Sequence, residues 1–162
     1  MSRYEKVYSM MMEKLEAEMP SKLSYHSLNH ILDVLKSAIE LAEMENLSAV
    51  DTELLKVAVL FHDAGFIETV RGHEDVGYRL AKEILLQFGY YESEIKEIGG
   101  MIMATKIPQS PKNKLEEIIA DADLEYLGTD EAAKKADDFF KELHHLHPSL
   151  TKEEWDKRQI SF

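Results

Sequence analysis

Cysteine is absent from this 162-residue sequence, which excludes disulfides, zinc–thiolate sites and thiol nucleophiles. Glycine and proline are scarce, at 7 and 4 residues, so few positions interrupt regular structure. No apolar run approaches the roughly 20 residues that a membrane-spanning helix needs. The N-terminal residues begin an amphipathic pattern instead of a signal-peptide core. These absences predict a cytoplasmic protein with no membrane partner.

Positive charge is also in short supply, because 19 basic residues face 31 acidic ones and the formal net charge is −12. Duplex nucleic acid attracts basic surfaces, so we do not expect it as a partner. A small phosphorylated substrate remains compatible, since a bound metal can supply the local positive charge that such a substrate needs. We expect that kind of substrate as the partner and leave a homodimer open.

No segment alternates apolar and polar residues as a strand would, whereas apolar residues recur at steps of three and four along most of the chain. The segment 54–61 is apolar nearly all round, which predicts a buried central helix. We therefore predict an all-α fold of seven to eight helices, a single compact domain over residues 1–162. The predicted helices cover about 4–19, 28–42, 51–61 (starting near Ser48 or Asp51), 73–88, 95–103, 114–127 and 130–145, with a last helix after Thr151.

His62 and Asp63 directly follow the most apolar helix, where an ionisable pair is costly unless something compensates it. Alone, the pair is explained as well by local hydrogen bonds at a helix end. His26 and His30 stand four residues apart, so they share one helix face. That spacing can place both imidazoles on a metal, or one on a metal and one on a substrate, and a polar pair near a helix start explains it equally.

Asp121 and Asp123 form the third group of candidate ligands. Asp121 follows the apolar residues 118–120, so it continues an apolar face, while Asp123 points nearly the opposite way on a helix. A solvated acidic turn is the alternative for both. Combined imidazole and carboxylate ligands suit Mn, Fe, Zn, Ni or Co, and Mg stays open. Such a ligand set leaves coordination positions for water and substrate, as metal-assisted hydrolysis requires.

Four ordered motifs now carry a family resemblance: YHSLNHILDV (25–34), LFHDAGF (60–66), GHEDVG (72–77) and IADADLEYLG (119–128). Over roughly residues 20–130 the chain resembles the HD-domain metal-dependent phosphohydrolases. The resemblance implies an all-helical fold, with motifs at about 20–130 and further helices at 130–162. It also implies hydrolysis of nucleotides or other phosphate esters, with four metal ligands. Those ligands are His30, His62, Asp63 and a late aspartate, for which we choose Asp121, with Asp123 as the alternative.

The resemblance suggests roles for further residues. His26 matches a histidine that in related phosphodiesterases protonates the leaving oxygen, a role that suits a pKa near neutrality. His73 and Glu74 match a pair that in some relatives lies by the metal or binds a second one, so we count Glu74 with Asp63 among the catalytic candidates. Lys106 is a candidate to hold a phosphate oxygen, although a solvated helix end is the simpler interpretation.

Two other functions remain open at this point. Some proteins with this ligand set hold two irons and oxidise their substrate with oxygen, and His73 would then be the obvious additional ligand. A metal-stabilised sensing or interaction domain without turnover is the second alternative. Phe66 stands where one subgroup that hydrolyses cyclic dinucleotides has lysine, which counts against that substrate.

The last predicted helix opens with a capping-box pattern at Thr151 and Glu154. It carries Trp155, the only tryptophan of the chain, and a buried tryptophan contributes one of the largest apolar areas a side chain can offer. We predict that Trp155 docks this helix onto the domain near the metal cleft. A frayed terminal helix is the alternative.

Overall fold

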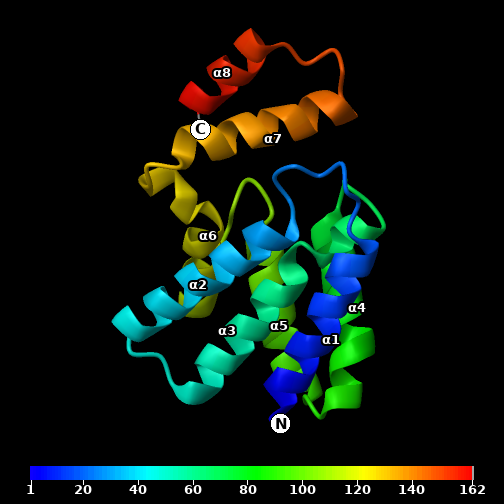
Figure 1. The fold of residues 1–162 in the computed structure, drawn as a ribbon. Coiled ribbons are helices and arrows are strands. Elements are labelled where there is room, and N and C mark those ends of the chain that lie inside the picture. Colours follow the sequence, from blue (N-terminus) through cyan, green and yellow to red (C-terminus); the bar gives the residue numbers. More distant parts are fainter. Residues whose placement is uncertain (162) are drawn as a thin grey trace.

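The computed structural model describes the backbone of residues 1–161 and the side chains of residues 1–159. All regular structure in that part of the chain is helical, and it contains no strand (Figure 1). The predicted all-α fold is therefore confirmed. The α-helices are α1 (Arg3–Glu18), α2 (Leu28–Met44), α3 (Ala49–His62), α4 (His73–Leu85), α5 (Glu92–Ala104), α6 (Lys114–Leu124), α7 (Ala132–Leu146) and α8 (Lys152–Ser161). Three short 3-10 turns are η1 (Ala64–Ile67), η2 (Leu86–Phe88) and η3 (Glu125–Gly128).

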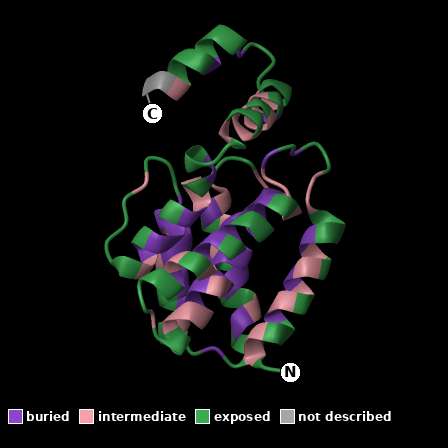
Figure 2. Ribbon diagram, turned by 60° about the vertical axis from the view of Figure 1, so that its left-hand side comes forward, coloured by how far each residue is buried: buried purple, intermediate pink, exposed green. Residues whose placement is uncertain are grey.

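Helix α3 is the centre of the bundle, in contact with α1, α2, α4, α5 and α6. Its residues from Val57 to Phe61 are fully buried, as the apolar run predicts, and Figure 2 shows the same burial along the middle of the bundle. Because His62 is the last residue of this helix, its imidazole lies directly at the end of the apolar core. None of the described helices is long and apolar enough to cross a membrane.

Capping side chains begin several helices where the sequence indicates. Ser2 and Glu5 form a capping box on α1, and Thr151 and Glu154 form the predicted one on α8. Two predicted helices end earlier than expected, because their last turns tighten into 3-10 geometry at η2 and η3. Gly89 closes η2 with a φ of 81°, the left-handed conformation that glycine adopts readily.

Two glycines bring α4 against the end of α3. A Cβ on Gly65 would lie 1.9 Å from the carbonyl oxygen of His73, and one on Gly77 would lie 2.4 Å from that of Phe61. Any side chain at either position would force the two segments apart. The glycines therefore allow His73 and Glu74, in the first turn of α4, to lie beside Asp63.

Helices α7 and α8 form a hairpin at one end of the bundle (Figure 1). Trp155 is 4% exposed, and its ring meets the edge of Phe139 at a centroid distance of 5.2 Å. Phe139 in turn stacks on Tyr25 at 4.7 Å. The predicted docking of α8 through Trp155 is confirmed, and the aromatic contacts extend from it to the loop before α2.

Candidate metal centre

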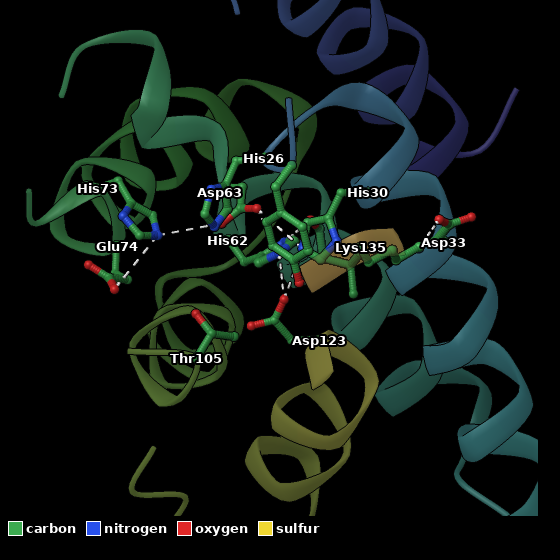
Figure 3. Close-up of polar contacts among 12 residues, drawn as sticks. His26, His30, Asp33, His62, Asp63, His73, Glu74, Thr105, Asp123 and Lys135 are labelled. Carbon is green, nitrogen blue, oxygen red and sulfur yellow. Dashed lines mark hydrogen bonds and ion pairs between the residues drawn. The ribbon is translucent and has the colours of Figure 1, made fainter. Parts of the chain in front are cut away.

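Four side chains from three parts of the bundle converge at one point. His30 comes from the first turn of α2, His62 and Asp63 from the end of α3, and Asp123 from the last turn of α6 (Figure 3). His30 Nε2 lies 3.0 Å from Asp123 Oδ1 and 3.5 Å from Asp63 Oδ2. His62 Nε2 lies 3.3 Å from Asp63 Oδ2 and 3.5 Å from Asp123 Oδ1.

These separations suit the ligands of one metal ion. With metal–ligand bonds of about 2.1 Å, neighbouring ligand atoms are roughly 3.0 Å apart in octahedral and roughly 3.4 Å apart in tetrahedral coordination. The four measured separations, between 3.0 and 3.5 Å, span that interval. Among the described residues, His30, His62 and Asp123 form a group whose ligand atoms all lie within 4.8 Å of one another. Asp63 is not part of that group and joins it through its distances to the two histidines.

Two atoms of the cluster have no hydrogen-bond partner among the described residues although both are buried: His62 Nε2 and Asp63 Oδ2. Leaving such atoms unsatisfied costs free energy, so their pairing at one point calls for a ligand. His62 Nδ1 lies 2.8 Å from the carbonyl oxygen of Val59 and donates to it, which leaves the Nε2 lone pair free in the neutral ring. The donor set therefore fits a divalent cation.

The electrostatics of the cluster also favour a cation. Burial disfavours the His62 imidazolium, but the charges of Asp63 and Asp123 outweigh it and raise the pKa of His62 to about 9. Burial likewise opposes the two carboxylates, yet the neighbouring histidines keep the pKa of Asp63 well below its usual range and that of Asp123 at about 2. Protons on imidazole thus balance these carboxylates when no metal does, and a divalent ion would replace them.

Asp121 does not join the cluster, which corrects our choice of the late aspartate. Its side chain is exposed, whereas Asp123 points inward. The physical reason lies in the buried arc of α6, in which Asp123 stands one turn after the fully buried Ile119. The apolar run before Asp121 misled the sequence-based choice. Ile118, Ile119 and Ala120 are all buried although they point in different directions around the helix, so the run does not show which direction the next buried residue takes.

A second group of ligand atoms faces the other oxygen of Asp63. His73 Nε2 lies 3.4 Å from Asp63 Oδ1 and 3.6 Å from Glu74 Oε1. His73 Nδ1 is 3.1 Å from the carbonyl oxygen of Val70 and donates to it, so Nε2 again carries the lone pair. The pair His73–Glu74 therefore lies next to the first group, as the sequence motif suggests.

His26 stands at the rim of the site. Its ring centroid is 6.0 Å from that of His30 and 6.1 Å from that of His73, and its face stacks on Phe66 at 4.3 Å. Its Nδ1 contacts the Oε1 of Glu142, a buried carboxylate on α7. Sequence reasoning missed Glu142, because no local pattern marks it and its contacts are with residues more than 100 positions away in the chain.

Lys106 is not brought together with the cluster. It is exposed, and its ammonium lies 3.5 Å from an oxygen of Asp75, which is also exposed. The side chains open to solvent at the site are His26, His73 and Asp123, at 16–17% exposure, whereas His62 is fully buried. A substrate would therefore approach from the side that these three residues border.

A polar cavity of about 340 Å³ lies next to His30, between the start of α2 and the start of α7. Its lining includes Ser27, Asn29 and Lys135, and Lys135 is held 2.5 Å from Asp33. The cavity offers room for a polar ligand beside a residue of the cluster. Its lining carries both signs of charge.

Comparison with known proteins agrees with this geometry. The HD domain family matches residues 27–126, a range that contains His30, His62, Asp63 and Asp123. A crystal structure of a predicted HD superfamily hydrolase from an uncultured Thermotogales bacterium has the same fold, with a TM-score of 0.66 at 21% identity over 78% of this chain and 72% of that one. No curated protein matches the chain. The chain thus belongs to the HD domain family.

Proposed function

We propose that this protein is a metal-dependent phosphohydrolase that cleaves a phosphate mono- or diester of a nucleotide or another small phosphorylated metabolite. The observation that carries the proposal is a cluster in which His30 and His62 each lie 3.0–3.5 Å from an oxygen of Asp63 and of Asp123, and two of these atoms are buried without a hydrogen-bond partner in the described chain. Such a donor set leaves coordination positions open for water and a substrate oxygen.

The ligands of the metal would be His30, His62, Asp63 and Asp123. When bound, a divalent ion supplies Lewis acidity and a water of lowered pKa. Manganese, iron, nickel, cobalt, zinc and magnesium all accept imidazole or carboxylate oxygen to some degree, so the donor set does not select one of them. The negative cluster and the net charge of −12 require such an ion before a phosphate can approach.

The protein's own side chains would then guide the protons. Asp63 and Glu74 both lie within 4 Å of His73 Nε2, and either would accept a hydrogen bond that orients the attacking water. His26 would donate its Nε2 proton to the leaving oxygen as the P–O bond breaks. Its ring is partly exposed at the rim, as are the side chains of Asp123 and His73.

The test is metal analysis combined with a substrate screen. The purified chain and Asp63→Ala would be assayed with nucleotides and sugar phosphates in Mn²⁺, Co²⁺, Ni²⁺ and Mg²⁺. We expect the wild type to bind metal and hydrolyse at least one ester, and Asp63→Ala to lose both properties while remaining helical by circular dichroism. Metal binding without turnover over the whole panel would instead indicate a non-catalytic sensing or interaction domain.

A second function is favoured by one observation, the donor group of His73, Glu74 and Asp63 Oδ1. Because Asp63 directs one oxygen to each group, it could bridge two metal ions, as an iron-dependent oxygenase would need. Two irons per chain, a mixed-valence paramagnetic signal and oxygen consumption would establish this function. One metal per chain and hydrolysis under anaerobic conditions would exclude it.

A further inference from the structure

Glu142 is the one fully buried residue of α7, whose other residues are exposed or half-buried. Its side chain is 1% exposed, and one oxygen, Oε2, accepts the backbone N–H groups of Tyr25 at 2.8 Å and His26 at 2.9 Å. The other oxygen, Oε1, contacts Nδ1 of the His26 ring. A single buried carboxylate from α7 therefore holds both the backbone and the ring of His26. It lies outside the part of the chain that the family matches.

The contacts with Glu142 determine whether Nδ1 of His26 carries a proton. Burial disfavours the Glu142 carboxylate, but the hydrogen bonds from His26 and from the backbone lower the pKa of Glu142, so it is ionised at neutral pH. An ionised carboxylate only accepts hydrogen bonds. The proton between the two residues therefore belongs to His26 Nδ1, and Nε2 is the nitrogen left to exchange a proton with a substrate.

The surroundings fix the direction of the ring as well as its tautomer. Phe66 stacks on one side of His26 at 4.3 Å, and Phe139 meets it edge-on at 5.3 Å. No hydrogen bond to His26 Nε2 occurs within the described residues, and the ring stands about 6 Å from those of both His30 and His73. Nε2 is thus the ring nitrogen without a hydrogen bond, while Phe66, Phe139 and Glu142 hold the rest of the ring in place.

We infer that Glu142 is a positioning residue, which fixes the tautomer and the direction of His26 so that the Nε2 proton is delivered to the leaving oxygen. This inference rests on the proposed hydrolysis. As the P–O bond breaks, the leaving oxygen takes the proton from Nε2, and the ring becomes neutral with Nδ1–H still bound to Glu142. A proton from solvent then restores Nε2–H. Helix α7 completes the site in this way from outside the four motifs.

Glu142→Gln separates positioning from a purely structural role, because glutamine has the same shape. Its carbonyl oxygen can still accept the two backbone N–H groups, so the loop and α7 stay joined, but its amide N–H then faces Nδ1 and favours the opposite tautomer. We expect kcat to fall by about 10²–10³, with KM, metal content and unfolding midpoint nearly unchanged. Asp137→Asn, an exposed carboxylate on the same helix, is the matched control and should match the wild type.

Two results would overturn the inference: a kcat for Glu142→Gln within about threefold of wild type, or equal losses of kcat and stability. A double variant gives a further test, because Glu142→Gln should cost little more once His26 is replaced by glutamine. Full additivity of the two losses would show that Glu142 acts independently of His26.

A spectroscopic measurement keeps this inference separate from the proposed function. Long-range ¹H–¹⁵N correlation spectra of the zinc-loaded protein, at a pH where the ring is neutral, report the tautomer of His26, with His26→Gln providing the assignment. We expect Nδ1–H in the wild type and Nε2–H in Glu142→Gln. Nε2–H in the wild type would refute the positioning role even if hydrolysis is found. Nδ1–H in a protein that hydrolyses nothing would refute only the proposed function.

Discussion

At the scale of single residues, the site depends on which nitrogen or oxygen each side chain leaves free. His62 and His73 both use Nδ1 to donate to a backbone carbonyl three residues earlier, and both present Nε2 to Asp63. Asp63 divides its two oxygens between them. The same contact from a ring nitrogen to a backbone carbonyl, at the end of α3 and at the start of α4, thus orients the ligand atoms before any metal binds.

His26→Ala tests the role of the residue at the rim. His26 is not among the four ligand residues, so the variant should keep its metal content and lose about 10²–10⁴ in kcat if His26 is the general acid. Metal content by elemental analysis and steady-state kinetics on the same preparation are the measurements. Loss of metal would make His26 a ligand, and an unchanged rate would remove it from the mechanism.

The sequence predicted part of this site at residue level and missed two features. His62 and Asp63 could be singled out because they follow an apolar run, and His30 because of its spacing from His26, while the family resemblance implied that they act together as ligands. The choice between Asp121 and Asp123 depends on where the buried arc of α6 ends, which is set by packing against neighbouring helices. Glu142 is buried only because the backbone N–H groups of residues 25 and 26 face it, a contact across 116 residues that no local pattern reveals.

At the scale of elements, the helices themselves were predictable because apolar spacing, caps and breakers agree along the chain. Their close approach is a different matter, since it depends on where two backbones meet. Gly77 lies where α4 crosses the end of α3, and its position in the sequence gives no hint that Phe61 is its neighbour. The placement of His73 and Glu74 beside Asp63 follows from that crossing.

Gly77→Ala should therefore disturb the site from a distance. The new Cβ would lie 2.4 Å from the Phe61 carbonyl oxygen, so α4 must shift, at a cost of about 1–3 kcal/mol in the free energy of unfolding. Gly128→Ala is the control, because a Cβ added there would meet nothing within 4 Å. Urea unfolding of both variants is the measurement, and equal stabilities would show that α4 does not pack as tightly as described.

A partly buried ion pair joins α1 to α5, and it leads to a prediction about how stability depends on pH. Arg3 binds Glu94 in a bidentate manner at 2.7 and 2.9 Å, which lowers the pKa of Glu94 below its usual value. A lowered folded-state pKa stabilises the fold above the unfolded pKa, and this stabilisation is lost as pH falls through the folded value. Glu94→Gln should cost roughly 1 kcal/mol at pH 7, after allowance for solvent screening.

The cost of Glu94→Gln should shrink as pH falls through the usual range of a glutamate and vanish only below the lowered folded-state pKa, where the wild-type carboxyl is protonated as well. Glu97→Gln, an exposed residue on the same helix, is the matched control and should show no such trend. Guanidinium or urea unfolding at several pH values measures both. A constant difference between wild type and Glu94→Gln at all pH values would contradict the ion-pair account.

At the scale of the whole molecule, the chain builds its site from two sources. Helices α2, α3, α4 and α6 supply the candidate ligands, and the hairpin of α7 and α8 closes over the loop that carries His26 (Figure 1). Trp155 and Phe139 attach that hairpin through aromatic contacts to Tyr25. The docking of Trp155 near the metal cleft was a sequence-based prediction, whereas the aromatic contacts through Phe139 to Tyr25 were not foreseen.

The overall charge of −12 gives the site its electrostatic requirement. A phosphorylated substrate meets a negative molecule and a cluster with two carboxylates, so a cation at the cluster must come first. Metal binding and hydrolysis should therefore be lost together when a ligand carboxylate is removed. The two aspartates of α6, two residues apart, allow this expectation to be tested within one helix.

The most direct test is a calorimetric metal titration, with Mn²⁺ or Zn²⁺, of the wild type, Asp123→Asn and Asp121→Asn. We predict one tight site in the wild type, an affinity at least about tenfold weaker in Asp123→Asn, and wild-type affinity in Asp121→Asn, whose side chain is exposed. Equal binding by all three proteins, or loss of binding in Asp121→Asn instead of Asp123→Asn, would contradict the metal centre described above.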